Sequence, residues 1–174
     1  MGEAITERDS LPVMTTLGVT TLISDSGVTR YRVNTEEWMM YDRKKPSYWA
    51  FEKGVYMEQF DSIFNVEASI KADTAYYYDK ERLWKLIGNV DIQNRKGERF
   101  NTELLYWNEA TQKVYSDKFI RIQQPDRIIT GHGFDSNQQM TIYTIRNIEG
   151  IFYVDEEASS GPPQPETKAL PDSV

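Results

Sequence analysis

The feature that most constrains the fold is a regular alternation of apolar and polar side chains between Leu86 and Tyr106, in LIGNVDIQNRKGERFNTELLY. Apolar positions before the central NRKG are Leu86, Val90 and Ile92, and the face after it carries Phe100, Thr102, Leu104 and Tyr106. A period of two is that of a β-strand, in which successive side chains point to opposite faces. NRKG has the composition of a turn, and Gly97 within it can adopt a positive φ. The segment is therefore predicted to be a β-hairpin with one apolar side.

This hairpin is one copy of a repeat. A shift of 30 residues places ADTAYYYDKERLWKLIGNVDI over TELLYWNEATQKVYSDKFIRI. The superposed pairs are Asp73 and Glu103, Tyr76 and Tyr106, Tyr77 and Trp107, Val90 and Ile120, and Ile92 and Ile122. No convincing amphipathic helix of about ten residues or more interrupts the strand pattern, and TEEWMMYD is short and compatible with a strand. We therefore predict an all-β domain of about 10–12 short antiparallel strands, as a roll, sandwich or open barrel.

Composition excludes several classes of function. The 174 residues carry 27 acidic and 20 basic side chains, a net charge of −7, which argues against binding of nucleic acid because that requires a basic surface. The absence of cysteine excludes disulfides, thiolate zinc sites and cysteine nucleophiles. No run approaches the roughly 18 apolar residues of a membrane span, and MGEAITERDS lacks the apolar core of a signal peptide.

The ends of the chain differ from its middle. Residues 1–16 are polar and aperiodic and are predicted to be a flexible lead. Residues 156–174 include ASSGPPQPETKALPDSV, which is rich in proline, serine and glycine and is predicted to be disordered. The folded domain is thus expected to span residues 17–155.

Candidate catalytic residues are few. His132, the one histidine, lies in TGHGFDSN, and no motif ties a serine or carboxylate to it, so a glycine-rich turn or bulge with an exposed histidine is the preferred interpretation. Five carboxylates near strand ends could pair as in a glycosidase: Asp73, Asp79, Glu81, Glu103 and Glu109. In a chain with 27 acidic residues, however, such proximity is common. We predict no catalytic residue, no cofactor and no metal site.

Aromatic residues, 13% of the chain, form clusters that include Trp38, Trp49, Trp84 and Trp107. They would fill a β core or form cross-strand pairs, or else line a surface that stacks on sugars or contacts lipid. The alternating apolar face has two interpretations of its own. An opposing sheet would make it an ordinary core, whereas splayed sheets would make it the lining of a groove for an acyl chain.

Five stretches resemble the periplasmic LptC proteins of lipopolysaccharide export, in particular members from Bacteroidetes. They are DSGVTRYRV, PSYWAFEKGVYMEQFD, IKADTAYYYDKERLWKLIGNVDIQN, FNTELLYWNEATQKVYSDKFIRI and ITGHGF. The resemblance covers about residues 17–155. It implies a twisted, open β-jelly roll, similar to OstA and LptA, in which two antiparallel sheets form a V around the acyl chains of lipopolysaccharide.

The resemblance also implies a function, a location and partners. The protein is expected to be non-enzymatic, to sit in the periplasm attached to the inner membrane through an N-terminal anchor absent from this chain, and to lack a cofactor. It would receive lipopolysaccharide, through the acyl chains of lipid A, from an inner-membrane ABC transporter and pass it to a periplasmic LptA-like β-jelly roll. The lipid-binding groove would be lined by Leu86, Val90, Ile92, Phe100, Leu104, Tyr106, Ile120 and Ile122.

Partner contacts are expected at the two free edges of the sheet. Gly27 corresponds to a glycine of the family's N-terminal strand region, and Gly131 to a glycine of its C-terminal part, with Gly133 as the competing alignment. The expected interface residues are Gly27, Tyr31, Val33, Gly131, Met140, Ile142 and Ile148. Two alternatives stay open: a lectin-like sandwich that stacks sugars on Trp38, Trp49 and Trp107, and a structural adaptor of outer-membrane biogenesis with a dry, closed core.

Overall fold

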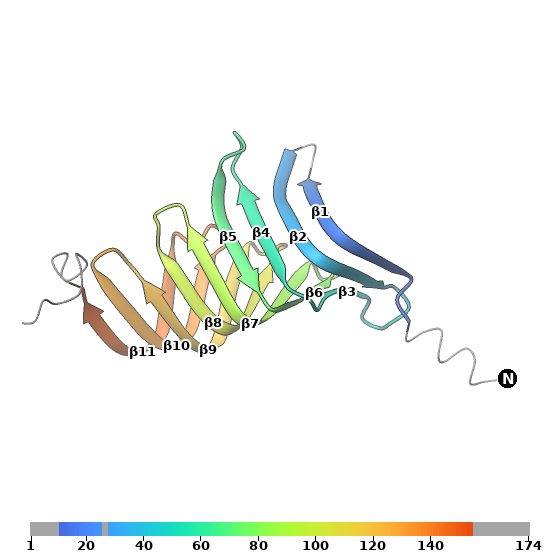
Figure 1. The fold of residues 1–174 in the computed structure, drawn as a ribbon. Coiled ribbons are helices and arrows are strands. Elements are labelled where there is room, and N and C mark those ends of the chain that lie inside the picture. Colours follow the sequence, from blue (N-terminus) through green and yellow to red (C-terminus); the bar gives the residue numbers. More distant parts are fainter. Residues whose placement is uncertain (1–10, 26–27, 155–174) are drawn as a thin grey trace, which may run out of the picture.

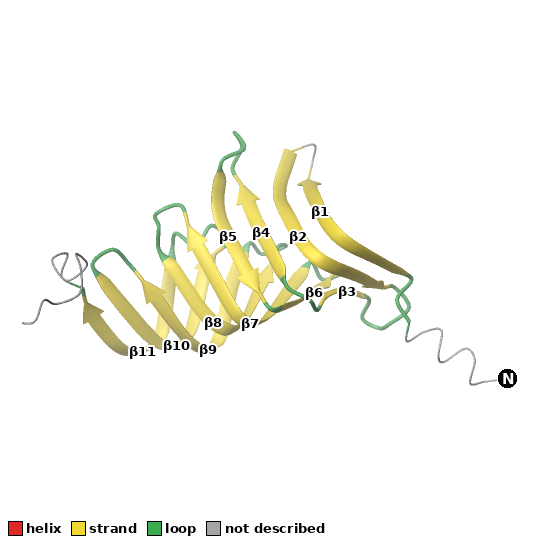
Figure 2. Ribbon diagram, in the orientation of Figure 1, coloured by secondary structure: helices red, strands yellow, loops and turns green. Residues whose placement is uncertain are grey.

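The computed structural model describes residues 11–25 and 28–154. Within these ranges the chain is all β, with eleven strands and no helix (Figure 2). The strands are β1 (Met14–Asp25), β2 (Val28–Tyr41), β3 (Tyr48–Phe51), β4 (Val55–Phe60), β5 (Val66–Ala72), β6 (Thr74–Tyr78), β7 (Leu83–Asn94), β8 (Arg99–Asn108), β9 (Lys113–Gln123), β10 (Arg127–Asn137) and β11 (Tyr143–Tyr153). All pairings are antiparallel, which confirms the predicted fold class.

The strands form one sheet that folds over itself. Strands β7 to β11 follow one another as neighbours, and β1 pairs only with β2 at the opposite end of the molecule (Figure 1). Between β2 and β7 the sheet takes two routes, because one half of β7 pairs with β5 and the other half with β6. Strand β2 is likewise shared between β4 and β3. The two long strands therefore pass from one layer of the fold into the other.

A row of β-bulges marks the place where the strands change layer, and we call this row the fold line. The register shifts between Ile87 and Val90 in β7, between Thr102 and Tyr106 in β8, and again within β9 to β11. Gly88 and Asn89 at the first bulge have φ angles of 82° and 46°. Bulges bend a strand and increase its twist, so a bulge at the same level in successive strands bends the whole sheet.

Contacts between opposite strand ends show that the fold is closed. Asn94 is the last residue of β7 and lies beside the start of β8. Met140 follows the end of β10, and that end pairs with the start of β9. Yet Asn94 Nδ2 donates a hydrogen bond of 2.8 Å to the Met140 carbonyl oxygen. We call the half that carries Met140 and Tyr143 the first layer, and the half that carries Asn94, Arg99 and Gln123 the second layer.

The interior between the layers contains most of the side chains that alternation assigned to it. Tyr77 and Trp107, which occupy equivalent places in the repeat, are both buried, and so are Ile92 and Ile122. Full burial of one such side chain contributes about 1.5–3 kcal/mol, so this single cluster is the main source of stability. The predicted turn is also present, with Gly97 at a φ of 77°.

Two described strands can be compared with segments named in the sequence analysis. Residues 35–41, from TEEWMMYD, belong to β2. Strand β1 begins at Met14, within the predicted lead, since its ladder to β2 starts with the pair Met14 and Met40. The rest of the predicted lead, residues 1–10, and the predicted tail, residues 156–174, lie outside the described residues.

Candidate functional site

The interior is filled by the protein's own side chains. Six of the eight residues predicted to line the groove are 0% exposed: Leu86, Val90, Ile92, Phe100, Ile120 and Ile122. The alternation thus identified the inner face, but the open trough expected there is closed in this structure. A slit between the layers, lined by Met57, Ile70 and Trp107 among others, has a volume of ≈ 10 Å³. That is about the space one water molecule needs, and an acyl chain cannot enter it.

Leu104 and Tyr106 do not lie where the alternation predicted. The buried residues of this half of β8 are Leu105 and Trp107, and Tyr106 stacks on Tyr115 of β9 at 5.3 Å between ring centroids. The reason is the bulge between Thr102 and Tyr106, which shifts the register by one residue and reverses the face of every side chain after it. The prediction that these two residues share a face with Phe100 is therefore wrong.

Polar contacts close the side of the roll opposite the fold line. Besides the bond to Met140, the side chain of Asn94 accepts hydrogen bonds of 3.0 Å from the backbone N–H groups of Lys96 and Glu98. The Tyr143 hydroxyl, from the first layer, donates to the Glu98 carboxylate of the second layer. Gln124 Nε2 donates in turn to the Tyr143 hydroxyl oxygen at 2.6 Å, and burial raises the pKa of Tyr143 to about 12.

These closing residues were missed by the sequence analysis, although a signal was present. Asn94 continues the apolar row of Val90 and Ile92 at the next inward position, and it is only 7% exposed. A polar side chain at an inward position of a strand must find a buried partner, which here is the carbonyl of the opposite layer.

A second polar group joins four strands around one carboxylate. Glu109, in the turn after β8, accepts hydrogen bonds from Tyr31 Oη (2.5 Å), Trp84 Nε1 (2.8 Å) and Tyr77 Oη (3.2 Å). Arg82 lies nearby, with 3.7 Å between its Nε and a Glu109 carboxylate oxygen. Burial, followed by the Glu109 charge, raises the pKa of Tyr31 and of Tyr77 above that of a free tyrosine. Both phenols therefore stay protonated and remain donors.

Beside this carboxylate the layers part into a cavity of ≈ 560 Å³, which we call the mouth. Its walls come from the β4–β5 turn, the β8–β9 turn and the β10–β11 loop, and Tyr31 and Trp107 form its inner end. The same two aromatic residues, with Gln59 and Gln138, also line the narrow apolar slit. The mouth therefore leads from solvent toward the interior, and side chains of the protein obstruct its inner end.

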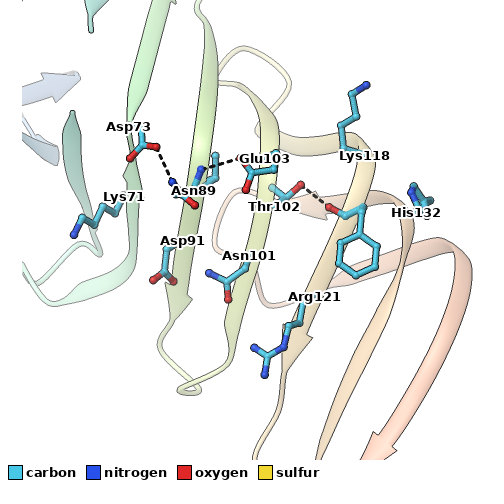
Figure 3. A pocket seen from close by; sticks show the side chains of 12 residues that line it. Lys71, Asp73, Asn89, Asp91, Asn101, Thr102, Glu103, Lys118, Arg121 and His132 are labelled. Carbon is cyan, nitrogen blue, oxygen red and sulfur yellow. Dashed lines mark hydrogen bonds between the residues drawn. The ribbon is translucent and has the colours of Figure 1, made fainter. Parts of the chain in front are cut away.

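A separate groove of ≈ 740 Å³ runs along the outer side of the fold line (Figure 3). Asp73 and Glu103 both accept hydrogen bonds from Asn89, at 2.8 Å from its side chain and 3.2 Å from its backbone N–H. Lys118 and Arg121 also line this groove (Figure 3). The groove is lined by both acidic and basic side chains, so it has no single electrostatic preference.

The remaining candidate catalytic residues are exposed or take part in single side-chain contacts. His132 is exposed, contacts the Glu149 carboxylate through Nδ1 and packs edge-on against Phe119. Asp79 accepts a hydrogen bond of 2.8 Å from Ser47, and Glu81 is exposed. In residues 11–25 and 28–154, no three acidic or histidine side chains gather as a metal site would require.

The three tryptophans of the lectin alternative are buried or partly buried. Trp107 is 4% exposed, and Trp38 and Trp49 pack against the core at 4.9 Å from each other.

Predicted interface residues fall in different environments. Gly27 lies outside the described residues. Tyr31 and Val33 are buried in the core, at 7% and 1% exposure, and β2 is paired along both edges. Gly131 and Met140 are also buried, whereas Ile142 and Ile148 are 76% and 57% exposed.

Gly131 is required by close packing between two strands. A Cβ atom at this position would clash with the Asn147 carbonyl oxygen and lie 2.7 Å from Ile145 Cγ2, both on β11. Gly133 has a φ of 83°, and a Cβ there would lie 2.9 Å from Arg146 Nε. Both glycines thus let β11 approach β10.

Comparison with known proteins assigns the family. A family model described as "Lipopolysaccharide-assembly, LptC-related" matches residues 13–150, which is most of the chain and almost the whole described sheet. No curated protein matches the sequence closely enough to be counted as a relative. None of the described residues forms a helix that could cross a membrane. The chain therefore belongs to the LptC-related family of lipopolysaccharide-assembly proteins, which are periplasmic and take part in lipopolysaccharide transport.

Proposed function

We propose that this protein is a non-enzymatic lipopolysaccharide carrier that accepts its cargo from an ABC transporter at the inner membrane and passes it to a second periplasmic β-jelly roll. Moving an acyl chain through water costs about 0.8 kcal/mol for each exposed methylene. A protein that shields such chains between two layers avoids this cost, and contact with apolar side chains is non-directional, so the lipid can slide. An apolar interior within a rolled sheet suits this task.

The observation that carries the proposal is the apolar surface at the β11 edge. In the part of the chain that the structure describes, strand β11 is the last strand of the sheet and pairs only with β10. Ile148, Ile151 and Tyr153 on this strand are 57%, 44% and 73% exposed. Ile151 pairs with Ile129, which packs against the core, so the apolar lining of the interior continues to the end of the roll and stops there uncovered. A second roll added at this edge would cover these side chains and extend the interior.

The other free edge supports a second contact. Among residues 11–25 and 28–154, strand β1 pairs only with β2, and Leu17 and Leu22 on it are 70% and 53% exposed. Unpaired backbone groups at a sheet edge recruit a further strand from a partner. We assign the β11 edge to the downstream roll and the β1 edge to the transporter.

Site-specific photocrosslinking tests these assignments in cells. Photoreactive residues at Ile148 and Leu22 are expected to capture different proteins, a periplasmic jelly roll at Ile148 and a transporter subunit at Leu22. Lys80, which is exposed and distant from both edges in the sheet order, is the matched control and should capture neither. Capture of the same protein at both edges, or of the two partners in the reverse order, would show the assignment to be wrong.

A further inference from the structure

A carrier of acyl chains needs a vacant interior, and this interior is full. The inference below therefore rests on the proposed function and concerns how the same site opens. The piece that fills the open side is the loop between β10 and β11, residues 138–142, which we call the cover loop. We infer that the cover loop is a displaceable lid, and that a lipid acyl chain binds in the space that the Met140 side chain occupies when the lid is closed.

Met140 is inserted into the core from a loop. Its side chain is 1% exposed and belongs to the buried apolar cluster, although both neighbours are accessible to solvent. Its φ of 59° is in the left-handed region, which non-glycine residues adopt at an energetic cost. A methionine side chain is an unbranched, flexible chain of about four heavy atoms, similar in shape and polarity to a short piece of hydrocarbon. It is a suitable substitute for an acyl chain.

Hydrogen bonds hold the cover loop to the second layer. Asn94 binds the Met140 carbonyl oxygen, and Tyr143, directly after the loop, binds Glu98. Replacing such bonds by bonds to water has a small net cost, because the donors and acceptors are hydrogen-bonded both when the loop is closed and when it is open. Gln124 Nε2, of the second layer, also donates to the Tyr143 hydroxyl oxygen at 2.6 Å. Within the first layer, Trp107 Nε1 donates to Gln138 Oε1 over a long 3.4 Å. The polar contacts of the loop are therefore ones that water can replace.

The cover loop has internal bonds that let it move as one unit. Asn137 Oδ1 accepts hydrogen bonds from the backbone N–H groups of Thr141 (2.9 Å) and Ile142 (3.1 Å), and Asn137 Nδ2 donates to the Thr141 hydroxyl at 2.8 Å. Asn137 is the last residue of β10, and these bonds stay intact when it turns together with the loop. Movement thus breaks the contacts with the second layer and preserves the fold of the loop.

The position of the loop connects the mouth to the interior. Gln138 and Gln139 form part of the mouth, and Gln138 also lines the slit opposite Met57 and Ile70. Withdrawal of the loop would remove these glutamines together with Met140. The mouth and the space between the layers would then be continuous.

Methyl signals test the inference directly. Met140 is 1% exposed, and Ile120, which is 0% exposed and lines neither the mouth nor the slit, is a matched control in the same core. With ¹³C-methyl methionine and isoleucine, Met140→Leu assigns the Met140 signal and Ile120→Val the control. Purified rough-type lipopolysaccharide is added, and broadening by a water-soluble paramagnetic agent is measured before and after. The Met140 signal is expected to shift and broaden several-fold more, while Ile120 stays protected.

A lipid-free measurement separates this inference from the proposed function. Tyr143→Phe keeps the ring and removes both hydrogen bonds of the hydroxyl group, the one to Glu98 and the one from Gln124, and this loss should raise the open fraction at least about fivefold. Broadening of Met140 but not of Ile120 in this variant supports a displaceable lid. Equal behaviour of the two methyls overturns it.

The three outcomes with lipid are then distinct. Bound lipopolysaccharide with an exposed Met140 supports the lid and the carrier. Bound lipopolysaccharide with Met140 still protected overturns the lid and leaves the carrier standing. If the wild type retains no lipopolysaccharide on gel filtration while Tyr143→Phe selectively exposes Met140, the inference of a displaceable lid is supported and the carrier function is refuted.

Discussion

Glu109 is expected to stabilise the fold more than any other carboxylate in the described ranges. Its side chain is 9% exposed and is the common acceptor for three donors from β2, β6 and β7, all on residues that are at most 8% exposed. Glu109→Ala leaves these buried donors without an acceptor. A buried polar group left unsatisfied costs about 1–3 kcal/mol, so with partial access of water through the mouth the total loss should be about 3–6 kcal/mol.

Urea unfolding followed by tryptophan fluorescence measures this loss as a change in the free energy of unfolding. Such a change approaches the whole stability of a small domain, about 5–15 kcal/mol, so Glu109→Gln is the milder companion. Its amide keeps one acceptor oxygen, and the expected loss is about 1–3 kcal/mol. Glu81→Gln, an exposed change of the same chemistry in the β6–β7 turn, should stay within about 0.5 kcal/mol of the wild type. A change below about 1 kcal/mol for Glu109→Ala would refute the reasoning, because the three bonds would then contribute almost nothing.

Further expectations concern the strands, the core and alkaline pH. Gly131→Ala should speed hydrogen exchange throughout β11, because the added Cβ clashes with that strand; Gly97→Ala, which strains a positive φ but meets no atom within 4 Å, should leave β11 exchange unchanged. Val90→Asp places a charge at a position with 0% exposure and should abolish the cooperative unfolding transition, while Gln93→Asp, exposed on the same strand, should preserve it. A transition retained by Val90→Asp would instead point to an accessible interior. Burial raises the pKa of Tyr143 from 10.0 to about 12, so the folded state keeps a proton that the unfolded state loses above pH 10. The stabilisation from this proton is complete below pH 10 and is lost between pH 10 and 12. Tyr143→Phe should therefore weaken the decline of the urea midpoint between pH 9 and 11.5. An unaltered decline would contradict this assignment.

The parts of the fold that the sequence could predict are those that depend on local period and turn chemistry. Alternation identified β7 and β8, the turn at Gly97 and the inward position of Ile92 and Ile122. The face of Tyr106 could not be predicted, because one extra residue in a bulge reverses all later side chains while leaving the composition of the strand unchanged. Bulges depend on how two strands pair, and a single strand's pattern does not contain that information.

Whether the interior is open was also beyond the sequence. An apolar lining is the same in a closed core and in an open groove, and the difference lies in contacts between residues far apart in the chain. Asn94 and Met140 are 46 positions apart, and their hydrogen bond exists only because the strands fold over. Gly131 illustrates the same limit: its sequence context fits an ordinary turn, yet the structure places it where β11 leaves no room for a side chain.

The fold line has a mechanical consequence. Each of the long strands runs through both layers and bends at one level, so the two walls of the roll are not separate sheets that could slide past one another. The two walls are joined along the bend, and spreading them at any one strand rotates the neighbouring strands about the same line. Any widening that begins at one end of the molecule is therefore transmitted through backbone hydrogen bonds to the other, from β7 through to β11.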